Sequence, residues 1–178
     1  MNADGSNQTQ LTNREGGYPR FVTLDGKWVY YEASLRQRLW KVAADGGEEM
    51  QVLDRKMYSP AFTPDGSLLA YIFHDGGMKI AVLSLADNKL LKVYTPADEK
   101  SWPDGLAWSG DNRTLNYITR RDTKNSLWQQ ALDADRPRFA ADLGDKAIND
   151  FAVAPDGDGF AYVRGEWLHN AVLISGLN

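Results

Sequence analysis

Short apolar segments alternate with turns along the whole chain of 178 residues. In the clearest stretch, we expect strands at residues 61–63, 68–73, 79–85 and 89–94, each bounded by Pro, Gly, Asp or Asn. Runs of about 4–8 residues rich in β-branched and aromatic side chains between such turn residues are typical of strands. Because the connections are short, consecutive strands pair as antiparallel neighbours, and the stretch predicts one small four-stranded sheet.

The same pattern recurs four times, and each recurrence is marked by an aspartate in the first turn. These aspartates are Asp25, Asp65, Asp111 and Asp156, separated by 40, 46 and 45 residues. Six positions after each of them stands a tyrosine, at Tyr31, Tyr71, Tyr117 and Tyr162. Four antiparallel strands in roughly 40–45 residues are the unit of a β-propeller blade, so the sequence predicts an all-β chain of four blades. We expect the tyrosines on equivalent second strands, largely buried between blades.

The first turn of each unit has a physical reason for its composition. In residues 63–66 (TPDG), Pro64 presets φ for the second turn position and Asp65 can accept a bond from the backbone ahead of it. Gly66 suits the last position of the turn. The turn therefore joins a short first strand to a longer second one.

The last predicted blade lacks a fourth strand, and the N-terminal segment contains a strand of that type. We expect blades at approximately residues 18–55, 56–96, 97–145 and 146–178, forming a single propeller domain or half-propeller. The last unit contains three predicted strands, ending with residues 171–174. Residues 1–13 contain a turn and a fourth-type strand at residues 8–12, so the N-terminal strand is expected to complete the last blade.

Two segments carry a resemblance to a known family. Residues 1–12 (MNADGSNQTQLT) and 62–71 (FTPDGSLLAY) resemble the repeat of the TolB-like, Trp-Asp-type β-propellers, which are relatives of the propeller domain of prolyl oligopeptidases. Residues 151–175 resemble the last blade of bacterial proteins in which a propeller follows a serine/threonine kinase or a winged-helix domain. The resemblance to TolB-like propellers covers essentially the whole chain. The resemblance of residues 151–175 implies a sensory or protein-binding role without catalytic residues. It also favours a periplasmic or extracytoplasmic location.

Pairing between the two ends can close a ring in two ways. Within one chain, it gives a four-bladed ring; between two chains, strand exchange gives an eight-bladed homodimer. Rings of the family usually have more than four blades, which implies a shallow wedge angle for each blade. We therefore favour the homodimer.

Composition limits the possible partners. The formal net charge is −4, which gives no general attraction to nucleic acid or anionic lipid. The absence of cysteine excludes disulfides and thiolate metal sites. No segment has the roughly 18 apolar residues of a membrane span, and residues 1–20 have no signal-peptide core. We expect no nucleic-acid binding and no membrane insertion.

The sequence gives little support for an enzymatic site. A serine hydrolase needs a Gly-x-Ser-x-Gly elbow, and none occurs. Two histidines, His74 and His169, without cysteine make a zinc site improbable. Asp133 and Asp135, or residues 156–158 (DGD), lack the calcium loop that would follow, so turn capping explains them better. We expect no catalytic activity, no cofactor and no metal.

A candidate binding face is formed by the loops between second and third strands and the connections between blades. Its best residue is Trp102 in the polar segment 98–104, because an exposed aromatic among arginines is typical of a protein-binding hot spot. The alternative is that Trp102 packs down between blades. The arginines also raise the idea of a sialidase-type cluster, but solvated strand and loop charges explain most of them. The candidate ligand-binding residues are Trp102, Tyr58, Tyr18, Arg36, Arg38, Arg120, Arg121, His74 and Trp167.

Two functions agree with these observations. The first is a non-catalytic binding or scaffold module that engages a protein, peptide or small ligand through the loop face. The alternative is a regulatory or substrate-gating propeller of a larger enzyme, a kinase or a peptidase, whose catalytic domain lies outside this chain.

Overall fold

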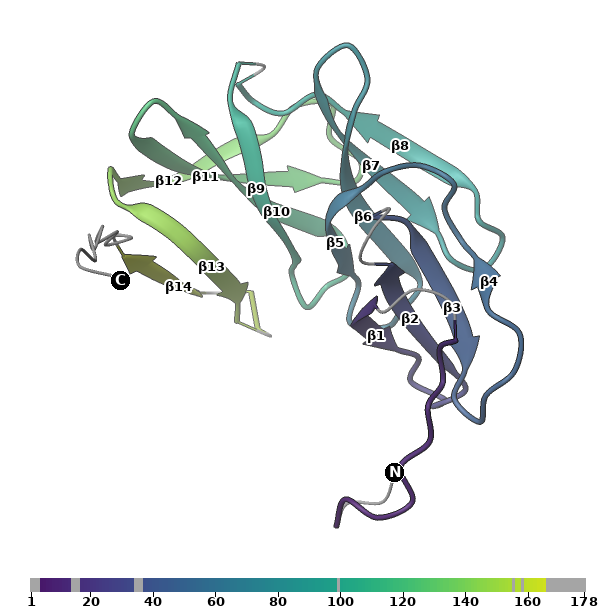
Figure 1. Cartoon of the computed structure of the whole chain (residues 1–178). Helices are drawn as coiled ribbons and strands as arrows, with labels where there is room; N and C mark the ends of the chain where they lie inside the picture. Colours follow the sequence, from purple (N-terminus) through teal and green to yellow (C-terminus); the bar gives the residue numbers. More distant parts are fainter. Residues whose placement is uncertain are drawn as a thin grey trace, which may run out of the picture.

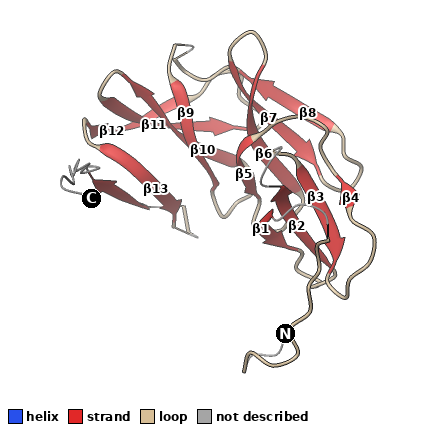
Figure 2. Ribbon diagram, viewed as in Figure 1, coloured by secondary structure: helices blue, strands red, loops and turns tan. Residues whose placement is uncertain are grey.

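The computed structural model of the chain describes residues 4–13, 17–33, 37–98, 100–154, 156–157 and 159–165. The regular elements of this part are all β-strands (Figure 2). They form three four-stranded sheets and one two-stranded sheet, set side by side in an open arc (Figure 1). Each sheet is one blade of a partial β-propeller, which confirms the expected fold class.

The four sheets follow the chain in order, and every strand pairs antiparallel with its neighbour. Blade 1 consists of β1 (Gly17–Val22), β2 (Trp28–Ala33), β3 (Leu39–Ala43) and β4 (Met50–Gln51). Blade 2 consists of β5 (Tyr58–Phe62), β6 (Leu68–His74), β7 (Met78–Ser84) and β8 (Leu90–Tyr94). Blade 3 consists of β9 (Trp102–Trp108), β10 (Thr114–Arg121), β11 (Lys124–Ala131) and β12 (Arg138–Gly144). Blade 4 contains β13 (Ala147–Val153) and β14 (Phe160–Gly165) in the described range.

Each blade packs face to face on the next one along the chain. The first strands β1, β5, β9 and β13 lie along the inner side of the arc and contact one another in sequence (Figure 1). Strand β6 shows why the blades stack: Leu69, Tyr71 and Phe73 belong to the core with blade 1, whereas Ala70 and Ile72 belong to the core with blade 3. Successive side chains of a strand point to opposite faces, so a strand buried on both faces is apolar throughout.

The first turn is built alike in all four blades. In blade 2, the Gly66 N–H donates to the Thr63 carbonyl at 2.8 Å, and the Asp65 carboxylate accepts the Ser67 N–H at 2.9 Å. Blade 3 places Asn112 where the other turns have glycine, and Asn112 takes the same left-handed conformation with φ 58°. Asparagine tolerates this region better than most residues, which explains why the motif survives there.

The four repeated tyrosines occupy β2, β6, β10 and β14, as the repeat alignment predicts. Tyr31, Tyr71 and Tyr117 are buried. The expectation was wrong for Tyr162, which is 38% exposed. Tyr162 stacks on Phe160 of the same strand with ring centroids 5.8 Å apart, and none of the core clusters of the described residues includes it.

The N-terminal segment reproduces a third-to-fourth-strand turn without a strand after it. The Asp4 carboxylate accepts the Ser6 N–H at 2.9 Å, as Asp87 accepts the N–H of Lys89 at 3.3 Å in blade 2. Residues 8–12 form no strand, and the Asn13 N–H donates to Glu49 of blade 1 at 2.9 Å. The predicted partner strand at residues 171–174 lies outside the described residues.

Candidate functional site

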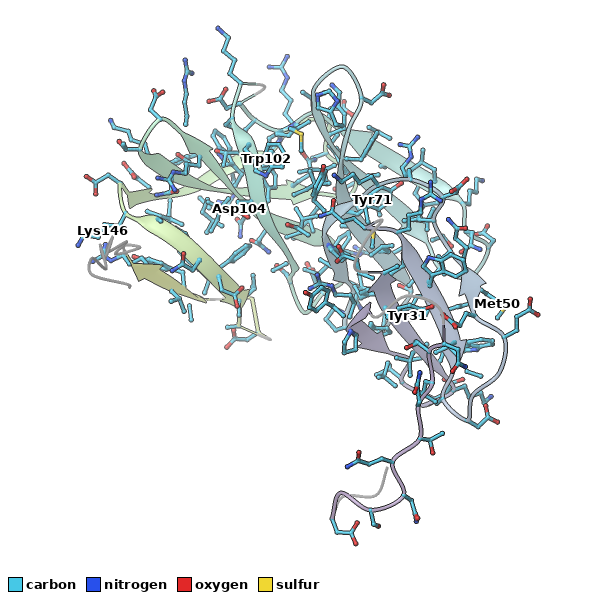
Figure 3. The ribbon with its side chains drawn as sticks, in the orientation of Figure 1. Tyr31, Met50, Tyr71, Trp102, Asp104 and Lys146 are labelled. Atoms are coloured by element: carbon cyan, nitrogen blue, oxygen red, sulfur yellow. The ribbon has the colours of Figure 1, made fainter. Side chains whose placement is uncertain are left out.

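An aromatic pair bridges the inner strands of blades 2 and 3. Trp102 begins β9 and Tyr58 begins β5, and their ring centroids lie 5.6 Å apart in an edge-on arrangement at 71°. Trp102 remains 51% exposed at the loop face (Figure 3). The expectation that Trp102 lies in a loop was wrong: it is the first strand residue, paired across the sheet with Arg120. It packs against Tyr58 on one side and faces solvent on the other.

A tight turn before β9 fixes the position of Trp102. The Asp98 carboxylate accepts the Lys100 N–H at 3.0 Å, and the Asp98 carbonyl accepts the Ser101 hydroxyl at 2.8 Å. Ser101 is buried as a result, and Pro103 is buried directly after Trp102. An aspartate that bonds the backbone two residues ahead is a common turn device, and here it holds the aromatic ring at the strand end.

Three exposed cations accompany the aromatic pair. Lys56 and Lys100 each stand two positions before one of the rings in the chain, and Arg121 ends β10. We call the pair and these three cations the Trp102 face. The ammonium group of Lys56 lies 5.2 Å from the centre of the Tyr58 ring, within cation–π range. Arg121 lies 3.5 Å from the Asp98 carboxylate. Sequence reasoning missed Lys56 and Lys100, although their positions in the connections between blades could have indicated both.

Arg120 has a different environment from its neighbour Arg121. It lines a hollow of about 50 Å³ between blades 3 and 4, together with Asp104 and Asn125. That volume has room for little more than water, so the hollow does not form a ligand pocket of ordinary size. Asp104 lies on the inner side of the arc (Figure 3).

The remaining predicted residues are spread over the arc. Tyr18 is exposed on β1, with the Arg20 guanidinium 5.9 Å from its ring. Arg38 pairs with Asp54 at 3.0 Å beside blade 1, and His74 ends β6 in an exposed position. Arg36 and Trp167 lie outside the described residues. The structure therefore brings together Tyr58, Trp102 and the Arg121 region, whereas Tyr18 and Arg38 belong to blade 1.

The groups with shifted pKa values are buried tyrosines and aspartates in the turns. Burial raises the pKa of Tyr71 and Tyr94, and raises that of Tyr117 to about 12. Hydrogen bonds from Thr23 and Lys27 lower the pKa of Asp25, and bonds from Ser67 and Thr63 lower that of Asp65. No group of three or more His, Asp or Glu that could hold a metal lies within the described ranges. The same part of the chain has no helix long and apolar enough to cross a membrane.

Solved structures with the same arrangement of blades identify the architecture. TolB from Acinetobacter baumannii superposes with a TM-score of 0.68 at 16% identity, over 87% of this chain and 39% of that one. The fold is a TolB-type β-propeller. A putative TolB from Agrobacterium tumefaciens gives 0.64 at 16% identity, over 82% and 53% of the two chains. A prolyl endopeptidase structure gives 0.59 at 23% identity, over 84% and 24%.

The chain spans about half or less of the length of these structures. No protein-family model matches the chain, and no curated protein matches it. Identities of 16–23% establish the TolB-type fold alone.

Proposed function

We propose that the chain is a non-catalytic binding module that engages a peptide segment of a partner protein through the Trp102 face. The observation that carries the proposal is the half-exposed Trp102 ring, held edge-on against Tyr58 from the preceding blade. Tryptophan and tyrosine are enriched among the few residues that supply most of the binding energy at interfaces. The pair is anchored on two strands and by the Asp98 turn, so little conformational entropy is lost on binding.

The charges at this face favour a partner segment that combines an apolar side chain with carboxylates. Lys56 and Lys100 are exposed beside the aromatic pair, and Arg121 is exposed next to Asp98. An apolar side chain would pack on Trp102 while carboxylates meet the flanking cations. Complementary charge raises the association rate and discriminates against basic partners.

The test uses a phage-displayed random peptide library panned on the purified chain. Selected peptides are synthesised and titrated against the wild type, Trp102→Ala and Phe139→Ala. Phe139 is a matched control, because it is 52% exposed and packs edge-on against Trp128 at 5.5 Å, but it lies on the outer strand β12.

Trp102→Ala should abolish peptide binding and leave the melting temperature within a few degrees, whereas Phe139→Ala should bind like the wild type. Peptides that bind Trp102→Ala as tightly as the wild type would refute the proposed face. A large loss of stability in Trp102→Ala, compared with Phe139→Ala, would identify Trp102 as a packing residue instead.

A second candidate function is a regulatory or substrate-gating propeller of a larger enzyme. The structural similarity to part of a prolyl endopeptidase supports a peptidase partner domain, and the resemblance of residues 151–175 supports a kinase or a winged-helix domain. An extracytoplasmic location is part of the same proposal and rests on the TolB resemblance. Sequencing the gene on both sides of this chain tests this candidate: a catalytic domain encoded in the same reading frame supports it, and none refutes it.

A further inference from the structure

Polar side chains lie at the two central positions of a cross-strand row in blade 3, where blade 2 has apolar ones. The cross-strand register places Ala107, Asn116, Gln129 and Arg138 side by side on the four strands of blade 3. The equivalent positions of blade 2 are Ala61, Ala70, Val82 and Lys92. Ala70 and Val82 are buried in the core between blades 2 and 3. Blade 3 therefore turns a polar row toward blade 4 where an apolar contact would be expected.

Hydrogen bonds join this row into one chain that ends on a guanidinium group. The side-chain amide of Asn116, which is 2% exposed, donates to the Ser109 hydroxyl at 3.0 Å, and its carbonyl accepts the Gln129 amide at 3.0 Å. The Gln129 carbonyl in turn accepts a bond from Arg138. Because each amide is oriented by the one before it, the Arg138 guanidinium is fixed from the blade interior.

A second arginine beside it stands on an anchored loop. Arg136 lies in the connection from β11 to β12. The buried Gln130 side chain donates to the Ala134 carbonyl at 2.8 Å, and the Tyr94 hydroxyl donates to the Leu132 carbonyl at 3.0 Å. Two buried side chains, Gln130 of blade 3 and Tyr94 of blade 2, thus hold the loop that carries Arg136.

Both arginines line a cavity of about 500 Å³ between blades 3 and 4. Gln129, Asp111 and Asp156 line it as well. The cavity opens at the end of the blades where the first turns lie, whereas Trp102 lies at the opposite ends of the strands. Its volume falls within the roughly 300–1,000 Å³ that small-molecule sites occupy. Its walls carry two guanidinium groups and two carboxylates, so the lining is balanced in charge.

We infer that this cavity binds a small zwitterion of amino-acid or dipeptide size. The ligand carboxylate lies on the guanidinium groups of Arg138 and Arg136, because a planar fork of N–H donors matches a carboxylate in two bonds. The ligand ammonium group lies toward the Asp111 carboxylate, one oxygen of which accepts the backbone N–H groups of Arg113 and Thr114. A simple anion would meet the arginines alone, and a simple cation would meet the carboxylate side alone. This site is separate from the Trp102 face and does not depend on it.

The experiment is a titration followed by NMR on the full chain, with L-glutamine as the probe. Two matched compounds each remove one charge: glutaramate lacks the α-ammonium group, and 4-aminobutanamide lacks the carboxylate. Arg138→Gln is the test variant. Arg113→Gln is the control, since Arg113 is exposed near the same turn but does not line the cavity.

Glutamine should shift the side-chain signals of Arg138 and Gln129 at millimolar concentration. Arg138→Gln should weaken binding at least about tenfold, the loss expected for a charge-assisted pair, while Arg113→Gln binds like the wild type. Each matched compound should bind more weakly than glutamine. The inference is overturned if glutamine shifts no cavity signal, if the two arginine variants bind equally, or if either matched compound binds as tightly as glutamine. Should Arg138→Gln fail to fold, Arg136→Gln on the exposed loop provides the same comparison.

Discussion

Replacing Tyr117 by phenylalanine tests how the blades are joined. Tyr117 is 1% exposed, and its hydroxyl accepts the Ala97 N–H at 3.1 Å, so it bonds the connection that arrives from blade 2. At about pH 8, Tyr117→Phe should cost about 1 kcal/mol, the net contribution of one hydrogen bond. The cost is not larger because Ala97 is exposed and water can replace the lost acceptor.

The effect of the same substitution on the free energy of unfolding should change sign as the pH rises. Burial raises the pKa of Tyr117 to about 12, above the ordinary tyrosine value of about 10, so the folded state holds the phenolic proton longer than the unfolded state. The stability from this shift is fully present below pH 10 and is lost as the pH rises through 12. Near pH 11 the wild type should have lost about 1.4 kcal/mol that Tyr117→Phe keeps.

Urea unfolding at about pH 8 and about pH 11, followed by circular dichroism, measures both effects. The deficit of Tyr117→Phe should shrink to zero or reverse at the higher pH. Tyr162→Phe is the matched control, because Tyr162 holds the equivalent position on β14 but is exposed. At about pH 8, this variant should lose less stability than Tyr117→Phe, because Tyr162 is exposed. A Tyr117→Phe deficit that stays constant or grows with pH would refute the reasoning.

Three further outcomes follow from contacts at the inner strands and at the N-terminal segment. Gly105→Ala should cost about 1–3 kcal/mol in urea unfolding, because the new Cβ would lie 2.7 Å from the Phe151 ring. Gly76→Ala, at nearly the same φ but with nothing within 4 Å, should cost less, and equal losses would show that backbone strain alone matters. Deleting residues 1–13 should lower the melting temperature, since it removes the Asn13 bond to Glu49; an unchanged value would contradict this. Light scattering should give about twice the chain mass of 19.9 kDa if strand exchange closes a two-chain ring, and a mass near 19.9 kDa excludes that ring.

The blades were predictable because their signals are local. The Asp-containing turns and the tyrosines six positions later lie close together in sequence, and strands formed on both sides of each turn. Prediction was less accurate where a property depends on distant residues. Trp102 was expected in a loop because its neighbours are polar, but pairing with Arg120 extends β9 to include it.

The candidate sites were partly visible in the sequence. Tyr58 and Trp102 were both candidates, but their edge-on contact depends on the packing of blade 2 on blade 3. The polar row of blade 3 was not foreseen, because Asn116, Gln129 and Arg138 are separated by turns and each is unremarkable alone. Aligning the repeats by strand register, instead of by turn, would have shown two polar residues, Asn116 and Gln129, where blade 2 has Ala70 and Val82.

The order of blade contacts has a mechanical consequence. Among the described strands, the main contacts between blades join neighbours along the chain, so blades 1 and 4 each have one such interface within this part. Blade 2 is held by two, through the cores that contain Tyr71 and Tyr117. Blade 3 is also held by two, through the core that contains Tyr117 and the cluster in which Ile118 packs with Phe151 of blade 4. In such an array, stability is approximately a sum over units and their interfaces. A force applied to the two ends should therefore detach the outer blades first and give a saw-toothed extension curve, with the middle pair yielding last.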